Sequence, residues 1–139
     1  MTVTDRKTDP LADEKLLQLL EKEHSYYQTI RSLSLEEKHL LNINTPLVEI
    51  TPILNQKKLL VASIQTIDTA LTPLKTYWEQ RKNMKDTYSE KIKTQLHEIQ
   101  RLLAEILEIN QSSQQKVELH LKELQLKQQL DEPNPMEGI

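Results

Sequence analysis

Residues 87–130 read TYSEKIKTQLHEIQRLLAEILEINQSSQQKVELHLKELQLKQQL and decide the fold. Apolar residues recur in this stretch at alternating steps of four and three, at Ile92, Leu96, Ile99, Leu103 and Ile106, and again at Val117 and Leu124. That spacing places their side chains on one face of a single α-helix. Two positions in the run, Asn110 and Ser113, are polar. The helix would be roughly 65 Å long, so the rest of the chain or a partner must cover its apolar stripe.

The composition indicates an all-α protein. The chain has 139 residues and one glycine, at position 138, and no proline lies between Pro73 and Pro133. Nothing in the backbone therefore forces the long helix to end early. Strands would show extended alternation of apolar and polar residues, and we find no such run.

Charge and composition argue against several classes of partner. The net charge is −3 with acids and bases interspersed, which leaves no basic stripe for a phosphate backbone, so we expect no nucleic-acid binding. The amino terminus lacks the apolar core of a signal peptide, and no segment approaches the roughly 18 apolar residues of a membrane helix. The chain has no cysteine and hence no disulfide framework. We expect a cytoplasmic protein without membrane insertion.

Prolines mark the expected helix boundaries in the first half of the chain, in the pairs Asp9-Pro10, Thr45-Pro46, Thr51-Pro52 and Thr72-Pro73. Each pair places a good N-cap side chain before a proline, which the first helical position tolerates. We interpret all four as helix starts or restarts. The sequence then predicts helices at about 10–42, 52–82 and 87–130, with a corner at 42–51 and a capping box at 87–90. Whether Pro73 bends or breaks the second helix stays open.

These helices predict a single domain over residues 1–130. Its architecture is an elongated antiparallel bundle of three main helices, of which the C-terminal one is the longest. Residues 131–139 contain two prolines and the glycine, and we expect them to form a flexible tail.

The sequence offers no convincing catalytic or metal site. Two Glu-x-x-His pairs, Glu21 with His24 and Glu36 with His39, are similar to half of a di-iron pattern. That site needs such pairs on two facing helices, whereas both lie on the first helix here. No Ser-His-Asp grouping, glycine-rich phosphate loop or cysteine nucleophile is present. We therefore expect no catalytic residue, metal or cofactor, and no enzyme activity.

Charged residues interrupt the apolar faces of the first two helices. Glu23 and Glu37 fall in step with the apolar face of the first helix, and Lys57 falls in step with that of the second. The favoured interpretation is that they sit at the edge of each face, with their stems packed and their charges in water. The alternative is that Glu37 and Lys57 pair across the hairpin and fix its register.

The order of these residues resembles the FlgN family of flagellar export chaperones. The family pattern is a glutamate, a tyrosine four residues later, leucines, a second glutamate, a short turn, and a lysine before paired leucines. In this chain its members are Leu16, Leu17, Leu20, Glu23, Tyr27, Ile30, Leu33, Glu37, Leu41, Leu47, Ile50, Thr51, Lys57, Leu59, Leu60 and Ile64, followed by Ile109, Asn110, Gln111, Ser113, Val117, Leu121 and Leu124.

The resemblance implies a small cytoplasmic helical protein that binds the C-terminal helical segments of the hook-filament junction (hook-associated) proteins before type III export. It also implies contact with components of the export apparatus. Many members carry a tyrosine after the last helix for that contact, and residues 131–139 have none.

Helix lengths suggest where a partner would bind. The first helix would reach about 48 Å and the second between about 30 and 48 Å, against about 65 Å for the third, so part of the third stripe stays uncovered. We expect residues 92 to about 103 to pack inside the bundle. The predicted partner-binding residues are Ile106, Ile109, Asn110, Ser113, Val117, Leu121 and Leu124. The alternative is a structural coiled-coil protein that forms a homo-oligomer through this stripe and has no secretion client.

Overall fold

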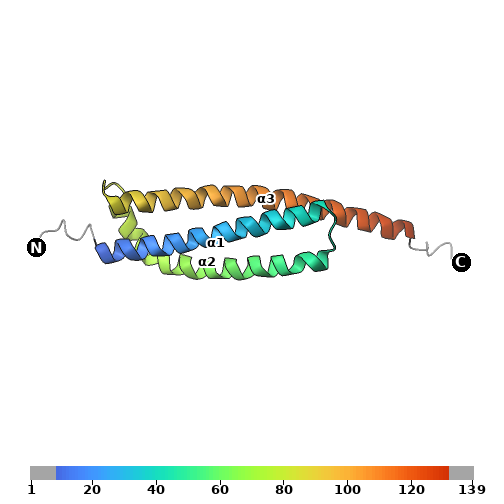
Figure 1. Cartoon of the computed structure of the whole chain (residues 1–139), viewed down its shortest axis with the longest axis horizontal. Coiled ribbons are helices and arrows are strands. Elements are labelled where there is room, and N and C mark those ends of the chain that lie inside the picture. The colour runs from blue at the N-terminus through green and yellow to red at the C-terminus, as the bar shows by residue number, and fades with distance from the viewer. Residues whose placement is uncertain (1–8, 132–139) are drawn as a thin grey trace, which may run out of the picture.

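The computed structural model describes residues 9–131, with the side chains of His120, Leu121 and residues 123–131 left out. This part of the chain forms three helices and no strand: α1 (Pro10–Asn42), α2 (Leu47–Arg81) and α3 (Thr87–Asp131). Consecutive helices run antiparallel, so α1 and α3 run in the same direction (Figure 1). The predicted all-α bundle is confirmed. The predicted tail at 131–139 lies outside the described residues apart from Asp131, where α3 ends.

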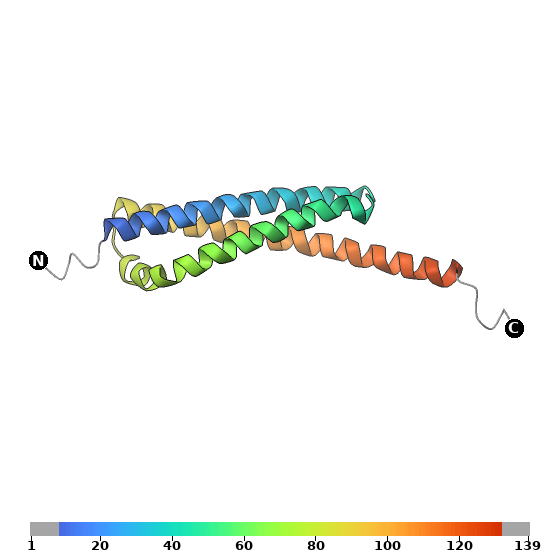
Figure 2. The ribbon, with the colours of Figure 1, turned by 90° about the horizontal axis from the view of Figure 1, so that it is seen from below.

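Helix α1 lies at the centre of the arrangement. It packs against both α2 and α3, whereas the backbones of α2 and α3 approach each other closely in hardly any place. Figure 2 shows α2 crossing the bundle obliquely, while α3 continues beyond the far ends of both other helices. The two outer helices therefore meet mainly through their side chains.

The start of α1 follows from its N-cap. The Asp9 side chain accepts hydrogen bonds from the backbone N–H groups of Leu11 and Ala12, and Pro10 takes the first helical position. A carboxylate suits this place because it satisfies unpaired amides and interacts favourably with the helix dipole. The predicted bounds of this helix are confirmed.

The predicted corner at 42–51 is too long. The turn spans residues 43–46, and α2 already begins at Leu47 rather than at 52. Asn44 takes the left-handed conformation with φ 57°, and the Thr45 N–H donates to the Leu40 carbonyl at 3.0 Å. Asparagine tolerates this conformation better than most residues, so it ends α1 in a chain without a suitable glycine.

Two of the four prolines lie inside a helix rather than at a helix start. Pro52 and Pro73 are both interior to α2, which runs without interruption through both positions. A proline there removes one backbone hydrogen bond. Both prolines are exposed, so water can hydrate the carbonyl groups left without a partner. The open question about Pro73 is thus answered: it does not break the second helix.

Two apolar clusters hold the bundle together. The larger one lies toward the start of α1 and joins all three helices through Leu16, Leu20, Ile67, Leu71, Ile92 and Ile99. The smaller one lies further along and consists of Ile30, Ile64 and Ile106. Fully burying a side chain of this size contributes about 1.5–3 kcal/mol, so these clusters supply much of the driving force for packing.

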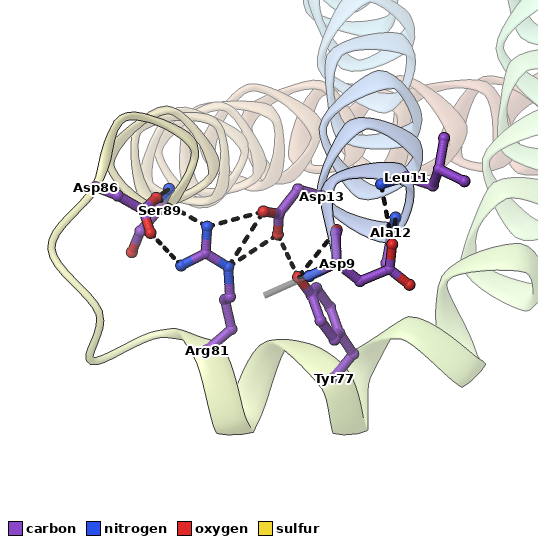
Figure 3. A network of polar contacts seen from close by, with 8 residues as sticks. All are labelled: Asp9, Leu11, Ala12, Asp13, Tyr77, Arg81, Asp86 and Ser89. Carbon is purple, nitrogen blue, oxygen red and sulfur yellow. Dashed lines mark hydrogen bonds and ion pairs between the residues drawn. The ribbon is translucent and has the colours of Figure 1, made fainter. Parts of the chain in front are cut away.

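A buried arginine joins the three helices at the closed end of the bundle (Figure 3). Arg81, at the end of α2, is 2% exposed. Its Nε and Nη2 donate to the Asp13 carboxylate of α1 at 3.0 and 2.8 Å, and Nη2 also donates to Asp86 Oδ1 at 2.8 Å. Tyr77 Oη donates to Asp13 Oδ1 at 2.7 Å. These hydrogen bonds, led by those to Asp13, raise the pKa of Arg81.

Asp86 also caps α3. Its Oδ1 accepts the Ser89 N–H at 2.9 Å, and its bonds to Arg81 followed by the one from Ser89 lower the pKa of its carboxyl group. The predicted capping box began one residue later, at Thr87. That assignment is wrong, because Asp86 satisfies the amide of Ser89 while it neutralises the arginine.

Replacing Arg81 should destabilise the fold strongly. In Arg81→Met the Asp13 carboxylate stays buried without its cation, and breaking a buried pair in this way costs about 3–5 kcal/mol. Urea unfolding followed by circular dichroism measures the loss. The matched control is Lys82→Met, because Lys82 pairs with Glu79 in solvent and should change stability by less than about 1 kcal/mol. Equal effects of the two substitutions would contradict the assigned role of Arg81.

Candidate docking groove

An apolar groove opens at the end of the bundle opposite Arg81. It lies where α1 ends, α2 begins and α3 continues, and its volume is about 580 Å³. All three helices line it, through Glu37 and Leu41 of α1, Leu47, Ile50, Thr51, Leu54 and Lys57 of α2, and Asn110, Ser113, Gln114 and Val117 of α3. A concave, mostly apolar surface with a few polar groups is typical of a binding site.

The walls of the groove are leucine-rich. Leu47 and Leu54, one heptad apart on α2, are 44% and 49% exposed, and Ile50 between them is buried. Leu41 and Val117 are half-buried on the other two helices. Residues three, four and seven apart share one helix face, so α2 offers a partner helix the same kind of surface as α3.

Three polar side chains meet at the floor of the groove, one from each helix. Lys57 Nζ donates to Asn110 Oδ1 at 3.1 Å and lies 3.7 Å from Glu37 Oε1. The Lys57 and Glu37 side chains are only 15% and 9% exposed. The favoured interpretation placed the charges of Glu37 and Lys57 in water at the edge of each helix face, and it is wrong. The alternative, in which Glu37 and Lys57 pair across the hairpin, is correct.

Some polar atoms at this floor lack a partner within the described part of the chain. They are Glu37 Oε2 and the Ser113 hydroxyl, both shielded from solvent. An unpaired buried polar atom costs about 1–3 kcal/mol. The packing of the three helices at this open end is therefore less stable than it would be if only apolar side chains met there.

The structure brings together part of the predicted site. Asn110, Ser113 and Val117 line the groove. Ile109 instead lies on the opposite flank of α3, in a depression that it shares with Leu35 of α1. The side chains of Leu121 and Leu124 lie outside the described residues.

Ile106 does not belong to an open surface in this structure. It is 6% exposed and packs with Ile30 and Ile64. The boundary between the covered and the open part of the stripe therefore lies about one turn further along α3 than the helix lengths predict. The reason is the register of the helices: Ile30 of α1 and Ile64 in the first half of α2 both pack on Ile106, and α2 begins at Leu47.

The predicted site did not include the residues of α1 and α2 that line the groove. Leu41, Leu47 and Leu54 were not among the predicted site residues. Leu47 was assigned to a corner at 42–51, and Leu41 and Leu54 were assigned to the two flanking helices, while the site was predicted on the third helix alone. The available signal was the heptad spacing of Leu47 and Leu54. It would have indicated a helix that begins before Pro52.

A second polar cluster lies between α1 and α2, nearer the middle of the bundle. Glu23 is 6% exposed, and its burial, together with the nearby Asp68 carboxylate, raises its pKa to about 7. Burial, Glu23 and Asp68 raise the pKa of the neighbouring Tyr27 to about 12. The interpretation of Glu23 as an edge residue with a solvated charge is also wrong.

The described residues hold no cluster of three or more His, Asp or Glu side chains suited to a metal ion. Nor does any helix in this part of the chain have the length and apolar character needed to cross a bilayer. In comparisons with known proteins, no family model, curated protein or solved structure matches the chain.

The Glu23 cluster predicts a pH-dependent stability. Because the folded-state pKa lies above the ordinary value of 4.5, the favourable contribution is complete below pH 4.5 and is lost as the pH rises through 7. The shift corresponds to at most about 3 kcal/mol. In Glu23→Gln this part of the pH dependence should disappear.

Urea unfolding at pH 5 and pH 8 measures the effect. The substitution should make the chain more stable than the natural sequence at pH 8, with a much smaller difference at pH 5. The exposed Glu21 on the same helix supplies the control Glu21→Gln, which should keep the natural profile. An unchanged profile in Glu23→Gln would disprove the assignment.

Proposed function

We propose that this chain is a cytoplasmic chaperone of flagellar type III export. It binds the C-terminal helical segments of hook-filament junction proteins, prevents their premature assembly and has no catalytic role. The observation that carries the proposal is the open apolar groove at the end of the bundle, which contains Asn110, Ser113 and Val117. These residues also belong to the pattern that resembles the FlgN family.

The proposed mechanism is occupancy of the client's apolar face. An amphipathic helix docks into such a groove through anchors at positions i, i+3, i+4 and i+7. Each square ångström of buried apolar surface contributes about 25 cal/mol, so several leucine-sized anchors offset the ordering of a disordered client segment. A client held in this way cannot use the same face to polymerise.

The polar floor supports a selective interaction. Lys57, Asn110 and Glu37 already form one connected set across the three helices. A partner helix whose register placed leucines against this floor would bury these groups without compensation. The groove therefore favours partners that carry a polar residue at the matching position.

An alternative function is that of a structural coiled-coil protein without a secretion client. The observation that favours it is the row of exposed leucines on α3, Leu103 and Leu107, outside the groove. Affinity for the junction proteins encoded in the same genome separates the two functions, because only the chaperone requires it.

Charges in the groove should abolish client binding. Replacing both Val117 and Leu121 with aspartate places two carboxylates on the proposed contact face, where desolvating them is unfavourable. We expect at least a 100-fold loss of affinity for the C-terminal segments of the junction proteins, measured by isothermal titration calorimetry, with nearly unchanged helix content.

The matched control replaces two exposed apolar residues away from the groove, Leu11 and Leu59, with aspartate. This double variant should bind as tightly as the natural chain. If the Val117 and Leu121 variant also binds with unchanged affinity, the assignment of the groove as the client site is wrong.

A further inference from the structure

The docking groove is polar at its inner end and apolar at its outer end. The polar floor forms the inner end, and beyond it the smaller apolar cluster fills the bundle. On α2, Leu54 lies three residues from Lys57 on the side of the open end. On α3, Val117 lies seven residues from Asn110 on the same side. A bound segment therefore meets polar groups at one end and apolar walls along the rest.

The groove is short. At 1.5 Å per residue, α3 rises about 10 Å between Asn110 and Val117, and α2 spans about 15 Å between Lys57 and Leu47. Only two or three turns of a helix fit along this length. Residues three, four and seven apart share one helix face, so about one residue of the bound helix faces the polar floor and the others on that face meet the walls.

The polar floor has hydrogen-bond donors to spare. The Lys57 ammonium can only donate, so the Asn110 atom that faces it at 3.1 Å is the carbonyl oxygen. The Asn110 NH₂ group is then directed away from Lys57, and it has no partner among the described residues. Unlike the Ser113 hydroxyl, it is not shielded from solvent. A bound helix can therefore reach this NH₂ group, which requires an acceptor.

The floor is also electrically neutral before a helix binds. Among the described residues that line the groove, Lys57 is the one cation and Glu37 the one anion, and their charged atoms are 3.7 Å apart. A carboxylate from the bound helix would face Glu37, and an ammonium or guanidinium group would face Lys57. Either would leave a net charge out of water, which is strongly unfavourable. The floor therefore favours a neutral side chain.

A carboxamide is the neutral side chain that matches this floor best. Its oxygen is an acceptor for the Asn110 NH₂ group, and its own NH₂ group supplies two donors. Glu37 Oε2 and the Ser113 hydroxyl both lack a partner, and a small rotation of either side chain would turn its oxygen toward the groove. A serine or threonine would supply one donor only, and an apolar residue would supply none.

We propose that the helix bound in the groove carries one asparagine or glutamine in an otherwise apolar face. Its carboxamide oxygen accepts from the Asn110 NH₂ group, while its NH₂ group donates to Glu37 or Ser113. Apolar residues three or four and seven positions away, on the side of the open end, pack between Leu54 and Val117. The inference rests on the proposed function, since this helix is the client of the same groove.

Such an amide would fix the register of the client. A single asparagine in an apolar seam does so in coiled coils, because any shifted register buries it and its partners without hydrogen bonds. The groove would thus reject helices with a fully apolar face, although they bury more apolar surface.

Designed helical peptides test this preference without assuming a natural client. Each labelled probe has about 18 residues, with leucines three or four and seven positions to one side of a single test position and with alanine, glutamate and lysine elsewhere. The test position carries glutamine or methionine, which have similar shapes. A second pair with the reversed sequence allows for either chain direction.

The glutamine probe should bind at least tenfold more tightly than the methionine probe in the direction that binds better, as measured by fluorescence anisotropy. The reason is that a site built to hydrogen-bond a group discriminates against an analogue that lacks it. Equal affinities of the two probes, or tighter binding of the methionine probe, would overturn the proposal.

Variants of the chain test which residue recognises the amide. Asn110→Leu removes the free NH₂ group and should abolish the preference for the glutamine probe. The matched control is Gln111→Leu, because Gln111 is the next residue on α3, is exposed and does not line the groove. It should keep the preference, and circular dichroism should show both variants folded. A preference that survives in Asn110→Leu would contradict the assigned pairing.

Segments of the junction proteins separate this inference from the proposed function. If the glutamine probe is preferred but no C-terminal segment of a junction protein binds, the proposed function fails and the inference stands. If a segment binds, and replacing all its asparagines and glutamines with methionine leaves the affinity unchanged, only the inference is wrong. The same anisotropy measurement, with labelled segments in place of the probes, distinguishes these results.

Discussion

The buried Arg81 guanidinium is the interaction on which the rest of the bundle depends. A charge that is 2% exposed is tolerable only when carboxylates compensate it, and here Asp13 comes from the start of α1 while Asp86 caps α3. One side chain at the end of α2 therefore fixes the longitudinal position of all three helices. Further along the bundle, contacts within the two apolar clusters keep the three helices in the same relative position.

The opposite end has a looser arrangement of charges. Lys57 and Glu37 are 3.7 Å apart, and Asn110 rather than a second carboxylate completes the set. Among residues 9–131 no helix closes this end, because α1 stops at Asn42 while α3 continues to Asp131. The molecule therefore combines a tightly paired end that sets register with an open end that exposes apolar surface, and differences in local stability of this kind are common at binding sites.

The sequence predicted the three helices well because helix formation depends on local signals. The absence of glycine, the Asp9-Pro10 start and the heptad spacing each act within a few residues. The Arg81 network could not be predicted in the same way, since Asp13 and Arg81 are 68 positions apart. Each falls in step with the buried face of its own helix, but the spacing within one helix does not state which residue of another helix pairs with it. Ile106 was assigned to the open surface for a related reason. The lengths of α1 and α2 do not state which residues of α3 they cover, because that depends on how the helices are aligned along the bundle.

The polar floor of the groove has a consequence for any complex formed there. A seam made only of leucine would hold many amphipathic helices in several registers, including wrong ones. Asn110, Ser113 and the Glu37–Lys57 pair would lower the affinity for a helix bound in the groove, and they would lower it most for a helix that places no polar group against them. For the proposed chaperone function, a moderate affinity would suit later release of the client, because dissociation rates rise as affinity falls. The same residues that weaken the open end of the fold would thus make exchange between occupants feasible.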